Sequence, residues 1–367
     1  MSDNEGDTRS MTHPLKTGGD RGYFRVATEE AFATREQVDA FLRLIREGRA
    51  DKGLTSLWGY YGQSPSERAT TILERLLDLG DCRIADMDAT GIDVAVLALT
   101  APGGQPFEAE EAKGIVRHAN DQLAAAAERY PGRYVGLTSI VPQDPAWSVE
   151  EIRRGARDLG FKGVMVNSHT QGHYLDEPVF DPIFRALAEV GQPLYIHPQT
   201  PPDTMIDPLL EAGLDGAIFG FGVETGMHLL RLMTSGLFDR YPNQQVIAGH
   251  GCEALPFWLY RLDYMHQGAV RSGRYDRMKP LKRGLPELMR QNILATTSGL
   301  PSPPSIKLCI EVMGEDRVMY AMDYPYQYVA DEVRTHDTLD LPAATLRKLM
   351  QTNAERVFGF KVGRASL

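Results

Sequence analysis

The sequence of 367 residues has few cysteines and no block of basic residues. Cys82, Cys252 and Cys309 lie far apart, and no CxxC pair occurs. We therefore expect neither a disulfide framework nor a thiolate zinc site, and three reduced cysteines indicate a cytoplasmic protein. Acidic residues outnumber basic ones by 49 to 39, and the net charge is −10. This charge, with scattered Lys and Arg, argues against nucleic acid as a partner.

Long apolar runs are also missing. No run approaches the roughly 18–20 residues that span a bilayer, so we expect no membrane partner. Residues 1–20 have almost no apolar content and no apolar segment of the signal-peptide kind, and we expect them to be a disordered lead. Apolar residues make up 43% of the chain, which is enough for the large core of one domain over residues 21–367.

Short apolar runs instead alternate regularly with amphipathic segments. Strands are predicted at 24–28, 94–99, 134–141, 163–166, 193–196, 246–249, 293–296 and 318–322, each followed by a helix. Eight such pairs predict an α/β fold, a (β/α)8 TIM barrel. An open doubly wound sheet would usually carry a Gly-rich phosphate loop after its first strand, where this chain has Glu29 and Glu30. Residues 51–66, rich in aromatics, are predicted to form an irregular loop over the barrel mouth.

Metal-binding or proton-handling side chains follow four of these strands, namely Glu29, His197, His250 and Asp323. The carboxyl ends of barrel strands meet at one rim, so these side chains should converge. Glu29, His197 and Asp323 are predicted metal ligands, because two carboxylates and one imidazole suit Mn²⁺ or Zn²⁺. Three protein ligands would leave open positions, as in catalytic sites. For His250 we favour an acid–base or supporting role over a further ligand.

Several polar residues are candidates for contact with a substrate. Asn167 and His169 end the fourth strand, at the same rim. Arg68 lies in the first turn of a predicted helix, where the helix dipole would favour an acid; binding of a carboxylate explains it, and so does a surface ion pair. Arg261 lies beyond His250 on a predicted helix, and could bind an anion in its own or a neighbouring subunit.

Long stretches of the chain resemble the decarboxylase branch of the amidohydrolase superfamily, which includes γ-resorcylate decarboxylase. The resemblance runs from about Val26 to Phe360 and is carried by residues 27–36, 56–70, 83–93, 159–163, 167–172, 193–198, 216–233, 253–267 and 314–333. It implies a distorted (β/α)8 barrel that forms homodimers or homotetramers. The implied reaction is metal-dependent, non-oxidative decarboxylation of a hydroxylated aromatic acid. Conversion of lignin-derived 5-carboxyvanillate to vanillate and CO₂ is the reaction we expect, with Mn²⁺ as the expected metal.

The resemblance also implies roles for individual residues. Glu29, His197 and Asp323 match the metal ligands, and His250 matches the histidine of the family's Gly-His segment. Arg68 and Arg261 match residues that hold the substrate, and Tyr61, Thr100 and Tyr326 match pocket walls. Asp323 would deliver a proton to the ring carbon that bears the carboxylate, with His250 orienting it.

The chain departs from the family pattern at two places. Hydrolytic relatives have His-x-His after the first strand and γ-resorcylate decarboxylase has Glu-x-His, whereas this chain has Glu29-x-Ala31. One family ligand is thus absent, which fits enzymes whose substrate completes the metal shell. Gly251-Cys252 replaces a Met-Gly-like pair. A metal-dependent hydrolase of an amide or lactone is the main alternative, and a non-catalytic binding barrel is a third.

Overall fold

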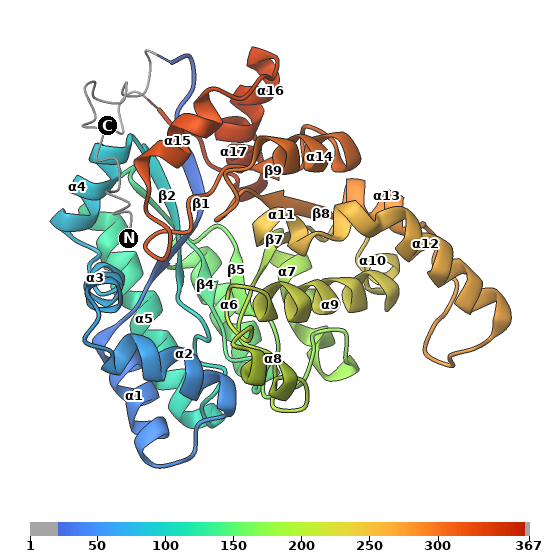
Figure 1. The fold of residues 1–367 in the computed structure, drawn as a ribbon, viewed down its shortest axis with the longest axis horizontal. Coiled ribbons are helices and arrows are strands. Elements are labelled where there is room, and N and C mark those ends of the chain that lie inside the picture. Colours follow the sequence, from blue (N-terminus) through green and yellow to red (C-terminus); the bar gives the residue numbers. More distant parts are fainter. Residues whose placement is uncertain (1–20, 364–367) are drawn as a thin grey trace, which may run out of the picture.

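Short parallel strands of mostly apolar residues form the centre of the fold (Figure 1). A computed structural model describes residues 21–363, so the prediction of a disordered lead over residues 1–20 lies outside the described residues. The strands are β1 (Val26–Phe32), β2 (Val94–Leu99), β3 (Tyr134–Gly136), β4 (Thr138–Ser139), β5 (Val164–Asn167), β6 (Leu194–His197), β7 (Val246–Ala248), β8 (Ile293–Thr296) and β9 (Val318–Met319).

The strands form two parallel runs, β1-β2-β3 and β4 to β9 in chain order. Hydrogen bonds bridge both gaps between the runs. Leu137, between β3 and β4, donates its N–H to the carbonyl of Leu97 at 2.9 Å, so β3 and β4 are two halves of one predicted strand. Thr28 of β1 donates to the carbonyl of Tyr320, just after β9, at 3.0 Å. Eight strand positions therefore follow one another in a ring, and the predicted barrel is confirmed.

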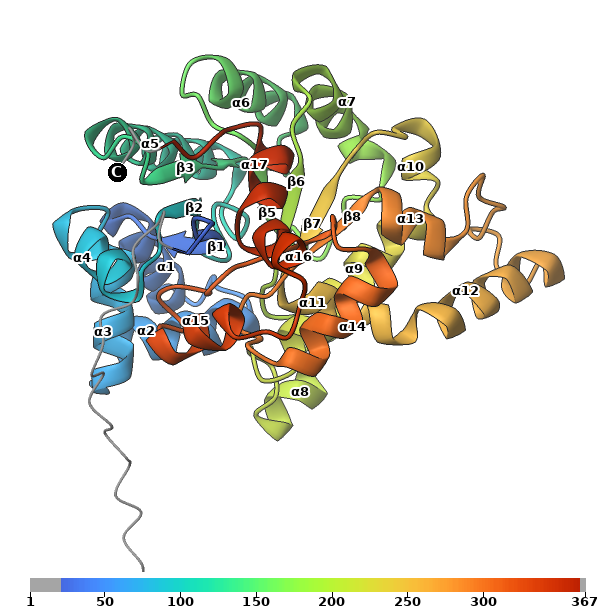
Figure 2. The same ribbon diagram turned by 90° about the horizontal axis from the view of Figure 1, so that it is seen from above.

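Helices surround the strands, as the view from above shows (Figure 2). They are α1 (Arg35–Arg46), α2 (Lys52–Gln63), α3 (Glu67–Leu76), α4 (Asp81–Thr90), α5 (Ala109–Arg129), α6 (Pro145–Arg157), η1 (Pro178–Phe180), α7 (Asp181–Val190), α8 (Asp207–Ala212), α9 (Gly220–Thr234), α10 (Leu237–Arg240), α11 (Gly249–Glu253), α12 (Leu255–Ser272), α13 (Leu285–Gln291), α14 (Pro303–Met313), α15 (Ala330–Asp337), α16 (Ala343–Arg347), η2 (Lys348–Thr352) and α17 (Asn353–Phe358). The distal end of α12 projects from the barrel as an arm (Figure 1). Among residues 21–363, no helix combines the length and apolar character needed to cross a membrane.

Residues 51–66 correct our expectation of an irregular loop, because most of them form α2. Asp51 caps this helix by accepting the N–H of Leu54 at 2.6 Å. Trp58 is fully buried, lies 4.9 Å from the ring of Phe41 and donates its Nε1–H to the carbonyl of Ala101 at 3.0 Å. Burial of this large ring outweighs the low helix propensity of the glycines in the segment.

The first strand is longer than we predicted: β1 runs to Phe32 and does not end before Glu29. Both glutamates therefore lie within the strand. Alternate strand residues fill the barrel in one buried cluster that includes Val26, Val96, Met165, Tyr195, Ile247, Leu294 and Met319. A ring of helices packs on the other strand face, so the barrel centre is a packed core and only its rim is free for chemistry.

Candidate functional site

A β-bulge in β1 places Glu29 inside the barrel. Ala27 pairs with Ala95 and Glu30 pairs with Leu97, so β1 has one more residue than β2 over this stretch. Regular alternation would send neighbouring side chains to opposite faces at fixed positions. The extra residue resets this alternation, and the Glu29 carboxylate lies among residues of β6 and β8.

One oxygen of Glu29 is held and the other is free of hydrogen bonds. Oε2 accepts from the hydroxyl of Thr296 at 2.9 Å and from the hydroxyl of Tyr195. Burial raises the pKa of Tyr195 well above its usual range, so this phenol stays protonated and donates. Oε1 is buried and has no hydrogen-bond partner; it faces Nε2 of His197 at 3.6 Å and Nε2 of His250 at 3.9 Å.

His197 ends β6 with one ring nitrogen already engaged. Nδ1 lies 2.7 Å from the carbonyl oxygen of Pro198, which can only accept, so Nδ1 carries the proton and Nε2 has a free lone pair. Burial lowers the pKa of His197, which favours the neutral ring. A neutral imidazole that donates one N–H to a carbonyl is the usual state of a metal-binding histidine.

His250 begins a left-handed turn rather than ending a strand. Residues 250–254 all have positive φ, between 51° and 65°, and only Gly251 is a glycine. This conformation costs roughly 1–2 kcal/mol for each non-glycine residue, and such strain is typical of functional sites. The turn brings Glu253 to 2.9 Å from Nδ1 of His250. Burial lowers the pKa of His250, but the carboxylates of Glu253, Glu29 and Asp323 outweigh burial and raise it to about 10.

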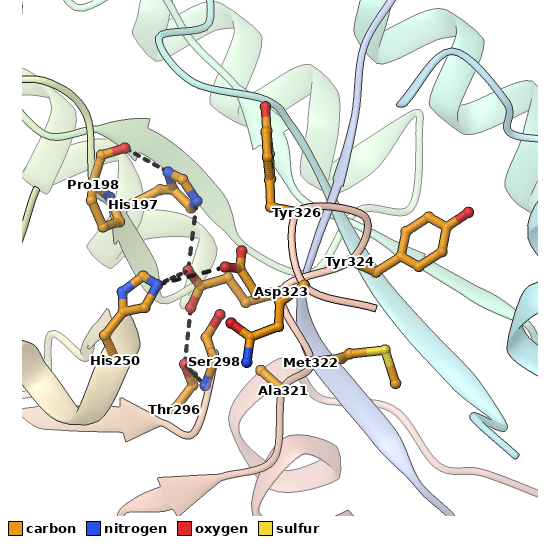
Figure 3. A network of polar contacts seen from close by, with 12 residues as sticks. His197, Pro198, His250, Thr296, Ser298, Ala321, Met322, Asp323, Tyr324 and Tyr326 are labelled. Atoms are coloured by element: carbon orange, nitrogen blue, oxygen red, sulfur yellow. Dashed lines mark hydrogen bonds and ion pairs between the residues drawn. The ribbon is translucent and has the colours of Figure 1, made fainter. Parts of the chain in front are cut away.

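Asp323 completes the group from the segment after β9. Its backbone is left-handed, with φ of 73°, and one carboxylate oxygen lies 4.0 Å from Nε2 of His250. Burial raises the pKa of Asp323, and His250 opposes this effect. Glu29, His250 and Asp323 each offer a ligand atom within 4.8 Å of the others. Figure 3 shows the rings of His197 and His250 directed toward this point and the ring of Tyr324 directed away from it.

The donor set fits a divalent metal ion. A buried carboxylate oxygen without a hydrogen-bond donor is costly, and here two histidine nitrogens share its surroundings. A cation beside this oxygen and the neutral Nε2 of His197 would satisfy both groups. Carboxylate oxygens and imidazole nitrogens suit Mn²⁺ or Zn²⁺. The predicted ligands Glu29 and Asp323 are thus brought together with His250, while His197 joins through its proximity to Glu29.

Four residues predicted to bind the substrate form one wall near Glu29, His250 and Asp323. Tyr326 follows Asp323 by three residues, and its hydroxyl lies 2.5 Å from that of Thr100. The rings of Tyr326 and Tyr61 are 5.5 Å apart at 67°, an edge-on contact. Arg68 donates to the carbonyl of Tyr326 at 3.1 Å and is otherwise exposed. Aromatic rings beside a cation suit a flat, anionic ligand.

Two other predicted residues lie differently. Arg261 is exposed on α12, where it lines a groove of about 820 Å³ with Trp258 and Tyr264 on the outer side of the molecule. His169 is buried, donates from Nε2 to the carbonyl of Thr200 at 3.0 Å and accepts the N–H of Gly172 at 3.1 Å. Both of its ring nitrogens therefore hold the loop after β5, and neither is free for a ligand.

The profile of the amidohydrolase family matches residues 69–360. The chain belongs to the amidohydrolase family. A γ-resorcylate decarboxylase from Rhizobium sp. (strain MTP-10005) is 33% identical over 307 residues, which cover 81% of this amidohydrolase and 92% of that enzyme. The parallel barrel agrees with this relationship.

Solved structures of two 5-carboxyvanillate decarboxylases are similar to this amidohydrolase. One, from Novosphingobium aromaticivorans, was crystallised with manganese and 4-hydroxy-3-methoxy-5-nitrobenzoic acid; it is 67% identical, with a TM-score of 0.94 over 96% of this chain and 100% of that chain. The other, from Sphingomonas paucimobilis, is 38% identical, with a TM-score of 0.87 over 92% of this chain and 100% of that chain.

Sequence reasoning missed three residues that support the amidohydrolase site. Tyr195 precedes His197 by two residues on a strand, and this spacing puts both side chains on one face, so alternation could have found it. Glu253 follows His250 at a spacing of three residues, but only the left-handed turn brings them together. Thr296 is the last residue of the predicted strand 293–296, and a single threonine there gives no signal of a functional role. The Gly251-Cys252 departure has a local reason: Cys252 is fully buried and a side chain at Gly251 would meet Cys309.

Proposed function

We propose that this amidohydrolase is a divalent-metal-dependent decarboxylase that converts 5-carboxyvanillate to vanillate and CO₂. The observation that carries the proposal is the convergence of Glu29, His250 and Asp323, with His197 beside them, under an aromatic wall that includes Arg68. The similarity to manganese-bound 5-carboxyvanillate decarboxylases supports the substrate and the metal.

Glu29, His197 and Asp323 would hold the metal ion, and Mn²⁺ is the ion we propose, with Zn²⁺ as the alternative. When bound, the metal would supply positive charge that orients a phenolate and its neighbouring carboxylate. Tyr195 and Thr296 keep Glu29 in place by holding its other oxygen. Nδ1 of His250 lies beside Glu253, and Nε2 is directed toward the carboxylates of Glu29 and Asp323. This arrangement favours the charged forms of these two carboxylates.

Asp323 is the proposed proton donor. A bare aryl anion is too unstable to leave behind, so the ring carbon must gain a proton before the carboxylate departs. The proton moves from Asp323 to that carbon, the carbon–carboxylate bond then breaks, and its electron pair restores the aromatic ring as CO₂ leaves. Burial around Asp323 and its 4.0 Å separation from His250 suit a group that gives and regains a proton.

The second carboxylate of the substrate needs a cationic partner. Arg68 lies against Tyr326 at the wall and is the proposed partner within the same chain. Arg261 lies on α12 at the outer side of the molecule, so we propose that it reaches a site only in a homodimer or homotetramer. The exposed side chains of Phe257, Trp258, Tyr260 and Tyr264 on α12 give a second copy an apolar surface to cover. A cytoplasmic location fits the three free cysteines.

The test is conversion of 5-carboxyvanillate by protein depleted of metal and then loaded with Mn²⁺. We expect metal-dependent appearance of vanillate and CO₂, and an Asp323→Asn variant should lose at least about 10²-fold in kcat. Asp331→Asn is the matched control, because that carboxylate is exposed and pairs only with Arg334 within the described residues. Near-normal turnover in Asp323→Asn would exclude its role as donor, and metal-dependent hydrolysis of an amide or lactone without CO₂ would favour the hydrolase.

A further inference from the structure

The neighbour of Glu29 is also a buried carboxylate, but it serves a different place. Glu30 is 5% exposed and lies outside the barrel interior, in a small space lined by Arg83 and Met87 of α4. Neighbouring strand residues point to opposite faces, so Glu30 faces outward once the bulge between Ala27 and Glu30 has turned Glu29 inward. Glu30 is not among the residues that gather at the proposed metal site.

Glu30 contacts the main chain on both sides of Asp323. Its Oε1 accepts the N–H of Met322 at 3.0 Å, and its Oε2 accepts the N–H of Tyr324 at 3.3 Å. Each carboxylate oxygen thus holds one of the peptide groups that flank Asp323. Both bonds are buried and join positions almost 300 residues apart in the chain.

These contacts fill a gap in the strand pairing. Thr28 donates to the carbonyl of Tyr320 at 3.0 Å, and Ala31 donates to the carbonyl of Tyr324 at 2.7 Å. Between these two bonds the chain after β9 arches away from β1 and turns left-handed at Asp323, with φ of 73°. An arch of this kind leaves N–H groups without strand partners, and buried N–H groups need acceptors. The carboxylate of Glu30 is that acceptor.

Arg83 fixes the outer side of the same arrangement. It is fully buried, donates to the carbonyl of Ala31 at 2.8 Å and stacks over the ring of Tyr324 at 4.6 Å. The guanidinium of Arg83 also lines the small space that holds the Glu30 side chain. The arch around Asp323 is therefore held from α4 and from β1 together.

We propose that Glu30 is a positioning residue for Asp323: its carboxylate holds the peptide groups on either side, and so keeps Asp323 in the left-handed conformation that faces Glu29 and His250. This inference rests on the proposed function only for the consequence to turnover. The consequence for metal binding follows from the cluster itself, because a relaxed arch would move Asp323 away from the other ligand atoms.

The test compares Glu30→Gln with Glu355→Gln. An amide keeps one acceptor oxygen but turns an NH₂ toward one of the two N–H groups, so the arch should open. Glu355 is also buried and accepts a backbone N–H, that of Val362 at 3.0 Å, but it lies on α17 away from the site. Mn²⁺ affinity of each variant is measured by the loss of the free-ion electron paramagnetic resonance signal, and kcat and KM are measured with 5-carboxyvanillate.

We expect Glu30→Gln to weaken Mn²⁺ binding and to lower kcat by about 10–100-fold each, with KM changed by less than about threefold, because Glu30 touches no substrate. In the Asp323→Asn background, Glu30→Gln should add little further loss of Mn²⁺ affinity, since both changes act through one carboxylate. Glu355→Gln should retain wild-type affinity and kcat. If Glu30→Gln fails to fold, Glu30→Asp, which withdraws the carboxylate by one methylene, undergoes the same comparison.

Wild-type Mn²⁺ affinity in Glu30→Gln would overturn the inference. So would an equal loss of affinity in the presence and absence of the Asp323 carboxylate. A wild-type protein that binds Mn²⁺ but releases no CO₂ from 5-carboxyvanillate would refute the proposed function alone, because the Mn²⁺ comparison would still decide the role of Glu30.

Discussion

Replacing Tyr195 with Phe removes one hydroxyl from the floor of the site. In the structure this hydroxyl donates to Oε2 of Glu29 and lies 3.1 Å from the hydroxyl of Thr296. A hydrogen bond to a charged group contributes roughly 1.5–3 kcal/mol, and 1.4 kcal/mol corresponds to a factor of ten in binding. Thr296 still donates to the same oxygen at 2.9 Å. We therefore expect Mn²⁺ affinity to fall by about 10–100-fold rather than to vanish.

The matched control is Tyr320→Phe. Tyr320 is equally buried, but its hydroxyl has no hydrogen-bond partner among the described residues. Its removal should leave Mn²⁺ affinity unchanged and stability unchanged or higher, because no bond is lost. Mn²⁺ titration of both variants, with urea unfolding of the metal-free proteins, checks the prediction. Unchanged affinity in Tyr195→Phe, or an equal loss in Tyr320→Phe, would refute the reasoning.

Two further predictions concern space and pH. In Gly249→Ala the new Cβ would lie 2.5 Å from Oε2 of Glu29, so we expect Mn²⁺ affinity to fall about tenfold or more. In the control, Gly268→Ala on α12, the new Cβ meets no atom within 4 Å, and the substitution should raise stability by about 0.5–1 kcal/mol. Equal Mn²⁺ titrations of the two variants would contradict this prediction. Burial lowers the pKa of His228 to about 3, against about 6.5 when unfolded, so its contribution to stability is complete above pH 6.5 and is lost as the pH falls. Between pH 7 and 5 the loss of stability due to His228 is about 2 kcal/mol. Urea unfolding at both pH values should show this loss in the wild type and in the control His118→Gln, but not in His228→Gln. An identical pH dependence of stability in all three proteins would refute the assignment of the loss to His228.

The barrel was predictable from the sequence because each parallel strand is buried on both faces. Such strands are short apolar runs, and segments like Val94–Leu99 stand out without any tertiary information. The convergence of Glu29, His250 and Asp323 was predictable for a related reason, since residues after parallel strands meet at one rim. The ligand types then indicated the kind of metal.

The details that make the site work were not predictable, because they depend on packing. Helix α2 forms because Trp58 is buried and donates a hydrogen bond to the carbonyl of Ala101. The glycine-containing sequence of α2 does not reveal these tertiary contacts. The bulge between Ala27 and Glu30, which turns Glu29 into the barrel, is set by pairing with β2 and not by either glutamate. The left-handed run that begins at His250 consists mostly of residues that avoid this conformation, so the local sequence does not predict it.

The bond from Thr28 to Tyr320 also has a consequence for biosynthesis. The first and last strands of the ring must meet before Asp323 can face Glu29, and they are separated by almost 300 residues. At about 5–20 residues per second, a ribosome needs on the order of 15–60 s to make the intervening chain. A nascent chain therefore exposes Glu29 and His197 well before Asp323 has been synthesised. With Asp323 as a proposed ligand, the proposed metal site would be complete only when translation is nearly finished, and a prematurely terminated chain would lack its closing segment.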